Sequence, residues 1–234
     1  NIASGVLTGV GNSGNIDISA RNIISKNSSI TTAVAGANQL ENLSLPPGKG
    51  KGGDISIKAS DSIIFSGTNA NGYSTGIASL TEKGTFGAAG NVSLSGRNIR
   101  IADGAIISAD TGNEDKGGDI SINADVFELF NGGQIRTGTN DAGNAGNILL
   151  NVKDRITISG SDSTFNQRIA LIEENLRRTG ANDDRINEAL NNNGAASGLF
   201  ANTFPGSTGN GGSIIIDPRE FVISNDGRIS GNSE

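Results

Sequence analysis

Short runs of alternating apolar and polar residues recur along the chain. Each run typically begins with glycine, then Asn, Asp or Ser, and then apolar, polar and apolar positions, as in Gly118-Asp119-Ile120-Ser121-Ile122. The glycines that open the six copies are Gly14, Gly53, Gly90, Gly118, Gly146 and Gly212, at intervals of 39, 37, 28, 28 and 66 residues. This pattern predicts a stacked-repeat protein with a basic unit of 28 residues and insertions in three of the five intervals.

Each unit contains three short segments in which apolar and polar residues alternate. In one copy they lie at 92–94, 99–101 and 106–108, and Asp103-Gly104 follows the second. A period of two places successive side chains on opposite faces and predicts β-strands. Asp-Gly, Asn-Gly and Gly-Gly steps supply the positive φ angles that tight corners require. The unit therefore predicts a triangular coil of three strands and three corners.

Stacking such coils predicts a parallel β-helix, because one coil cannot bury its own apolar face and stacked coils pair equivalent strands about 4.8 Å apart. We expect residues 1–234 to form a single all-β domain of about six coils. A doubly wound α/β fold would need helices of about ten or more residues between its strands, and the Gly-, Ser- and Asn-rich gaps disfavour it.

Columns of equivalent inward side chains, here called ladders, can be named in advance. The first strand is expected to stack Ile16, Ile55, Val92, Ile120, Ile148 and Ile214. The second is expected to stack Ile23, Ile63, Ile99, Phe127, Ile156 and Phe221. The third is expected to stack Ile2, Ile30, Ile77, Ile107, Ile135, either Leu199 or Phe200, and Ile229.

Three insertions interrupt the repeat. They lie at 37–52, which contains Pro46-Pro47, at 67–75, which contains the only tyrosine, Tyr73, and at 161–197. The second and third leave the same corner three coils apart, which corresponds to roughly 14 Å along the axis. We therefore expect Tyr73 and the longest insertion to border one surface.

The insertion at 161–197 predicts a helical hairpin. Helical spacing relates Phe165, Ile169, Ile172 and Leu176. Ser163 or Thr164 is expected to cap this helix and Gly180 to end it. A second helix is expected at 183–192, where Ile186 and Leu190 lie one turn apart. The two apolar stripes are expected to bury against each other and against the flank of the coils.

Two interpretations of the hairpin remain open. It is either a docking surface for a partner or a neighbouring copy, or a cover over a sheet face. The candidate partner or assembly surface consists of Tyr73, Phe165, Ile169, Ile172, Leu176, Ile186 and Leu190.

Composition excludes several kinds of chemistry. The chain has no Cys and no His, so the usual zinc ligands, thiol chemistry and Ser-His catalysis are absent and no cofactor is expected. A net charge of −6 and a pI near 4.7 argue against nucleic acid as a partner. No apolar run approaches the roughly 18 residues of a membrane span.

Parallel β-helices include polysaccharide lyases, so a polysaccharide-active enzyme is one functional hypothesis, ranked third after the two given below. Such a site needs clustered carboxylates with a Lys or Arg base on one outer face. Here the outward positions are mostly Ser, Asn and Thr, and Asp103 and Asp226 precede glycines at corners. Glu173-Glu174 and Asp183-Asp184 fall in the predicted helices, where acidic residues typically face solvent. We therefore expect no catalytic site.

Two repeat segments carry a resemblance to a known family. Their sequences are Ile101-Ala102-Asp103-Gly104-Ala105-Ile106-Ile107-Ser108-Ala109 and Gly118-Asp119-Ile120-Ser121-Ile122-Asn123-Ala124. These segments resemble the repeats of filamentous-haemagglutinin-like large exoproteins, particularly the cyanobacterial ones. The resemblance covers nearly all of the chain except the helical insertion. It implies a right-handed β-helix, two-partner secretion through an outer-membrane protein, and an extracellular or cell-surface location. It also implies a repeat-shaft role, because the secretion domain of that family has no counterpart here.

The first functional hypothesis is thus a structural and adhesive shaft module of an exported bacterial surface protein. Its expected partners are a cell surface, a glycan or a matrix component. The alternative is a self-assembling filament subunit. Ile2 and Ile229 both fall on the third ladder, so the two ends share one phase, and uncapped coil ends template association.

Overall fold

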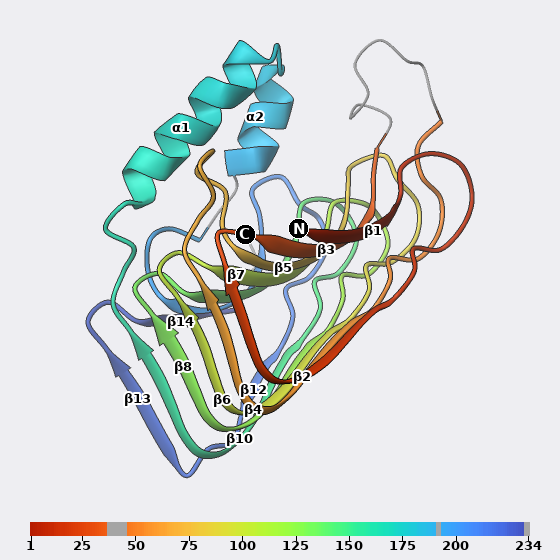
Figure 1. The fold of residues 1–234 in the computed structure, drawn as a ribbon. Coiled ribbons are helices and arrows are strands. Elements are labelled where there is room, and N and C mark those ends of the chain that lie inside the picture. Colours follow the sequence, from red (N-terminus) through yellow and green to blue (C-terminus); the bar gives the residue numbers. More distant parts are fainter. Residues whose placement is uncertain (37–45, 191–192, 232–234) are drawn as a thin grey trace.

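Two parallel sheets wind through the protein as one column of stacked coils (Figure 1). The computed structural model describes residues 1–36, 46–190 and 193–231. The first sheet contains, in spatial order, β1 (Ile2–Val6), β3 (Ser29–Val34), β5 (Gly76–Thr81), β7 (Ile106–Thr111), β9 (Gln134–Thr139), β11 (Gly198–Thr203) and β14 (Arg228–Ser230). The second contains β2 (Ile16–Lys26), β4 (Ile55–Ser66), β6 (Val92–Ala102), β8 (Ile120–Phe130), β10 (Ile148–Ser159) and β12 (Ile214–Ile216), with β13 (Glu220–Ser224) also paired to β10.

The predicted parallel β-helix is confirmed, and so are its three ladders. Ile55 pairs with Val92, and Val92 with Ile120, in the first ladder. The register extends the first ladder to Ile16 and Ile214 at its ends. The second ladder likewise runs from Ile23 to Phe221, and the third from Ile2 to Ile229. At the position that the sequence left open, Leu199 and not Phe200 joins the third ladder.

The structure differs from the prediction in the number of strands per coil. The first two segments form one long strand in β2, β4, β6, β8 and β10, and separate strands only as β12 and β13. The coil-to-coil hydrogen bonds continue around the corner between the two segments, with register shifts between Ala20 and Asn22, between Lys58 and Ser62, and between Val152 and Arg155. A local bulge lets a strand bend without losing its partners. A coil of this kind therefore has two strands, one long and one short, where three were expected.

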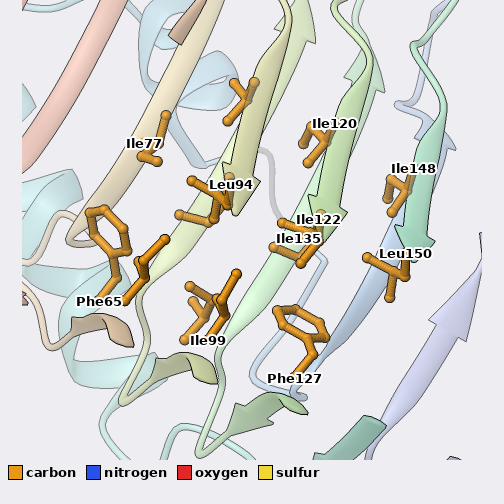
Figure 2. Packing of buried hydrophobic residues seen from close by; sticks show 14 of the residues in the cluster. Phe65, Ile77, Leu94, Ile99, Ile120, Ile122, Phe127, Ile135, Ile148 and Leu150 are labelled. Atoms are coloured by element: carbon orange, nitrogen blue, oxygen red, sulfur yellow. The ribbon is translucent and has the colours of Figure 1, made fainter. Parts of the chain in front are cut away.

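The ladders form one continuous apolar core (Figure 2). Phe65 on β4 and Phe127 on β8 are among the largest fully buried side chains. At the two outermost coils the same ladders open to solvent, where Ile2 is 48% exposed and Phe221 is 41% exposed. Burial therefore depends on a neighbouring coil on each side, as the stacking argument requires.

Close backbone approach explains the glycine at the start of every repeat after the first. A Cβ placed on Gly118 would overlap the carbonyl oxygen of Gly90, and one on Gly146 would overlap that of Gly118. The same overlap recurs at Gly53, Gly90 and Gly212. None of these glycines has a positive φ, so the lack of room for a side chain, and not an unusual backbone angle, explains their identity.

The Asn or Asp after this glycine connects successive coils. Its side-chain oxygen accepts a hydrogen bond from the backbone N–H of the equivalent residue one coil further on. These bonds are 2.8–2.9 Å long and join Asn15 to Asp54, Asp54 to Asn91, Asn91 to Asp119, Asp119 to Asn147 and Asn147 to Ser213. The recurring sequence pattern thus satisfies a backbone donor at this corner of successive coils.

At a different corner, residues adopt the left-handed backbone conformation with positive φ, as the Asp-Gly and Asn-Gly steps predicted. Asp103 has a φ of 56° and Asn131 a φ of 49°, and Asn131 Nδ2 donates to Asp103 Oδ1 at 3.1 Å. Both residue types tolerate this conformation better than other non-glycine residues. Asp226, with a φ of 68°, occupies the same kind of turn.

Candidate functional site

The helical insertion is joined to the column through a closed neck. Ser161 and Ala196 form an antiparallel bridge, and the Ser197 N–H donates to the Gly160 carbonyl at 2.9 Å. The Ser197 hydroxyl donates to the Ser159 carbonyl and accepts from the Gly132 N–H, both at 2.9 Å. Because the chain leaves and re-enters at one point, β10 and β11 keep their places in the stack.

The insertion contains α1 (Phe165–Arg178) and α2 (Asp183–Leu190) on the outside of the coils (Figure 1). The prediction of two helices is confirmed, and Thr164 is the residue at the N-cap. Its hydroxyl does not cap the helix. It donates instead to Asp162 Oδ1 at 2.7 Å. Gly180 follows the end of α1 with a φ of 82°, and residues 191–192 of the second predicted helix lie outside the described residues.

A buried ion pair fixes α1 to the neck of the insertion, and the same arginine contacts the neighbouring corner loop. Arg168 Nη2 lies 2.6 Å from Asp162 Oδ2, and both side chains are almost fully buried. Arg168 Nη1 donates to the Gly72 carbonyl at 2.9 Å. A Cβ on Gly72 would lie 2.8 Å from the Arg168 carbonyl and 3.2 Å from Ile172. The loop at 67–75 and the helical insertion are therefore in contact, and Gly72 makes that contact possible.

The two apolar stripes pack mainly against each other. Ile172, Leu176 and Ile186 are buried in a cluster separate from the main core, with Ala181 and Leu190 against it. The expectation that the stripes bury against each other is confirmed, and Ile172, Leu176 and Ile186 therefore do not form an exposed part of the candidate partner surface. The pairing of two short amphipathic helices hides part of the apolar stripe on each helix.

The remaining candidate surface is small. Tyr73 is 38% exposed beside Gly72, while Phe165, Ile169 and Leu190 are partly buried. The Arg168 guanidinium lies 5.9 Å from the centre of the Phe165 ring. Part of this surface is thus occupied by contacts within the protein.

The segment after α2 covers the outer face of the first sheet. Gln134 Nε2 on β9 donates to the carbonyls of Gly194 and Ala196, at 2.8 and 2.9 Å. Asn202 Nδ2 on β11 donates to Asn193 Oδ1 at 3.0 Å. These contacts favour the interpretation of the insertion as a cover.

A second buried ion pair lies on the same sheet. Arg136 Nη2 on β9 is 2.7 Å from Asp110 Oδ2 on β7, and the Arg136 guanidinium lies 5.7 Å from the Phe204 ring centre. Sequence reasoning missed both buried pairs. Asp162 and Arg168 are six residues apart, and Asp110 and Arg136 belong to different coils, so no local pattern marks either pair.

The electrostatics of Asp162 make the attachment of α1 sensitive to acid. Burial alone would raise the pKa of this carboxyl, but hydrogen bonds from Thr164 and Arg168 and the Arg168 charge outweigh burial, and the pKa lies below its ordinary value of 3.8. A carboxyl with a lowered pKa stabilises the folded state above its ordinary pKa. That contribution is lost as the pH falls through the folded-state pKa.

We therefore expect Arg168→Met to loosen the helical insertion while leaving the column folded. Removing one partner of a buried pair leaves an uncompensated charge, and a local cost of about 2 kcal/mol corresponds to a roughly 30-fold faster amide exchange in α1. Hydrogen exchange measured by mass spectrometry checks this. Arg177→Met, which removes the exposed contacts of Arg177 with Glu173 and Asp183, should change exchange little.

The same measurement at lower pH provides the second arm. After correction for intrinsic rates, protection of α1 should fall as the pH drops below 3.8, and Asp162→Asn should reduce this pH dependence. Equal protection of α1 in the Arg168→Met and Arg177→Met proteins would contradict the assigned role of the buried pair.

The described part of the chain offers neither a metal-binding cluster nor a membrane-spanning helix. In residues 1–36, 46–190 and 193–231, no group of three or more His, Cys, Asp or Glu side chains is placed to hold a metal ion. Neither helix of this part of the chain is long and apolar enough to cross a membrane. Residues 37–45 of the proline-containing insertion lie outside the described residues.

Comparison of the chain with known protein families, with curated proteins and with solved structures found no match. The functional argument therefore depends on the fold and on the surfaces described above.

Proposed function

We propose that this chain is a structural and adhesive module of an exported bacterial surface protein, in which stacked coils form a stiff shaft that displays loops and insertions. The observation that carries the proposal is the continuous stack itself. One core cluster includes Ile16 on β2 and Leu199 on β11, without a break between coils. Neighbouring coils are paired through continuous parallel strands.

Two further observations support a shaft. The Asn and Asp side chains that bond coil to coil add a second set of connections along the axis. The helical insertion is attached at a closed neck, so the column tolerates a large addition at one corner. A structure that accepts insertions at corners is suited to presenting binding loops on a constant support.

A self-assembling filament subunit is the second candidate, because the parallel pairing that joins neighbouring coils is also suited to joining the coils of two copies. Ile2 at one end and Phe221 and Ile223 at the other are 41–48% exposed, whereas their ladder equivalents inside the column are buried. A second copy placed on either end would bury these residues and pair the open strands.

Electron microscopy with antibodies against this chain, applied to intact cells of the source organism, tests both candidates. The shaft module predicts gold labelling on the cell surface without regular spacing along a fibre. The filament subunit predicts labels repeated along continuous fibres. Labelling confined to the cell interior would contradict both.

A further inference from the structure

An open trough runs along the column at the bend between the first two segments of the coils. It has a volume of about 570 Å³ and is lined by residues from β4, β6, β8 and β10 and by Asp217 in the connection from β12 to β13. The trough is open to solvent and differs in this respect from an enclosed ligand pocket.

The floor of the trough is made of small residues stacked in register. Gly96 pairs with Ala124, and Ala124 with Val152. Ala59 and Val152 belong to the apolar core and are almost fully buried. Because the side chains of Ala59 and Val152 point into the column, little side-chain bulk covers the backbone at the bend. A ligand can therefore approach the backbone there.

Polar groups border this floor and repeat from coil to coil. Ser95, Asn123 and Asn151 are in register on one side, and Asn151 Nδ2 donates to Asn123 Oδ1 at 3.2 Å. An amide side chain offers two donors and two acceptor lone pairs. One bond between two amides therefore leaves hydrogen-bonding capacity on both.

Charges of both signs line the trough. Arg97 is held by Asp61 at 3.1 Å and by a bond from Nε to the Ser60 carbonyl at 3.2 Å, and Lys153, Asp125 and Asp217 complete the set. Mixed charges favour neither a polyanion nor a polycation. Hydroxyl groups, which both donate and accept, suit a surface of amides, carboxylates and cationic donors.

The backbone in the trough argues against an extended peptide as the ligand. A peptide adds to a sheet through unpaired strand edges, and β6, β8 and β10 each have neighbours on both sides. A linear chain of hydroxyl-bearing rings needs no such edge. Laid along the axis, it meets an equivalent set of side chains about every 4.8 Å.

We propose that this trough binds a linear, neutral polysaccharide aligned with the column axis. The proposal deepens the adhesive function stated above and rests on it for its biological meaning. No aromatic residue is among those that line the trough, so recognition depends on hydrogen bonds repeated over several coils. Affinity must therefore grow with ligand length.

Titration of the purified protein with cellohexaose, xylohexaose and laminarihexaose, followed by NMR, tests the proposal. At least one hexasaccharide should bind, at least tenfold more tightly than its disaccharide. The double variant Asn123→Ala/Asn151→Ala should weaken binding at least fivefold. The control double variant, Ser93→Ala/Ser121→Ala, changes outward residues of β6 and β8 that do not line the trough and should leave affinity unchanged.

Each possible failure has a distinct meaning. No saturable binding of any of the three hexasaccharides, or binding that the asparagine variant leaves unchanged, overturns the trough as a glycan site. Tighter binding of hexagalacturonate or of a hexapeptide overturns the assigned ligand chemistry. Surface labelling in the microscopy experiment would stand in all these cases, so failure of the trough is distinguishable from failure of the shaft.

Discussion

Replacing Gly118 with alanine is expected to lower the free energy of unfolding by about 3–5 kcal/mol, because the new methyl group would overlap the backbone of the preceding coil. The atom in the way is the Gly90 carbonyl oxygen. A flexible side chain could rotate aside, but a backbone carbonyl can move only if the two coils separate. Separation would weaken the strand pairing on both sides of the corner.

A loss of this size is large for any single domain, since typical domains are stable by only about 5–15 kcal/mol. Urea unfolding followed by far-ultraviolet circular dichroism measures it. The matched control is Gly96→Ala in β6, where a Cβ would lie 3.5 Å from its nearest neighbours, which is ordinary contact. There alanine should be neutral or stabilise by about 0.5 kcal/mol through the unfolded state.

A Gly118→Ala protein that unfolds within about 1 kcal/mol of the parent would show that coil spacing at this corner adjusts easily. Such adjustment would weaken the case for a stiff shaft, because stiffness along the axis depends on the same backbone contacts.

The ladders could be predicted from the sequence because their determinants are local and repeated. Glycine followed by Asn or Asp marks one corner of each coil, and a period of two then assigns Ile55, Val92 and Ile120 to the inside. The structural reasons emerge only in three dimensions. The glycine makes room for a carbonyl, and Asp119 bonds to Asn91 and Asn147 in the coils on either side.

The continuous strand around one corner could not be predicted. Short segments separated by polar residues favour separate strands. The bulge between Lys58 and Ser62, across which β4 stays paired with β6, has no distinct sequence signal. This bend is also where the trough forms. Its polar lining comes from different coils, and only the register brings Ser95, Asn123 and Asn151 together.

The hairpin shows a different limit of sequence reasoning. Helical periodicity located both helices, but it does not say whether an apolar stripe faces solvent, the column or another helix. Arg168 lies among polar positions in the sequence and is nevertheless buried against Asp162. The insertion therefore combines a predictable local structure with an unpredictable mode of attachment.

The ladder assignment leads to a second large effect, at Ile120. Ile120→Asp should destabilise the protein by about 4–5 kcal/mol, because it places a carboxylate at a fully buried position between Val92 and Ile148. Ser121→Asp changes the next residue, which points outward between Ser93 and Leu149. It should stay within about 0.5 kcal/mol of the parent.

The position of a residue along the column should grade this effect. Ile214 belongs to the same ladder as Ile120 but lies in an outer coil and is only partly buried. Ile214→Asp should therefore cost clearly less than Ile120→Asp in the same urea experiment, since a partly solvated carboxylate loses less hydration. Equal losses at Ile120 and Ser121 would refute the assignment of inward and outward faces. Equal losses at Ile120 and Ile214 would show that burial does not increase toward the middle of the stack, which would contradict the structure of a column held together by contacts between neighbouring coils.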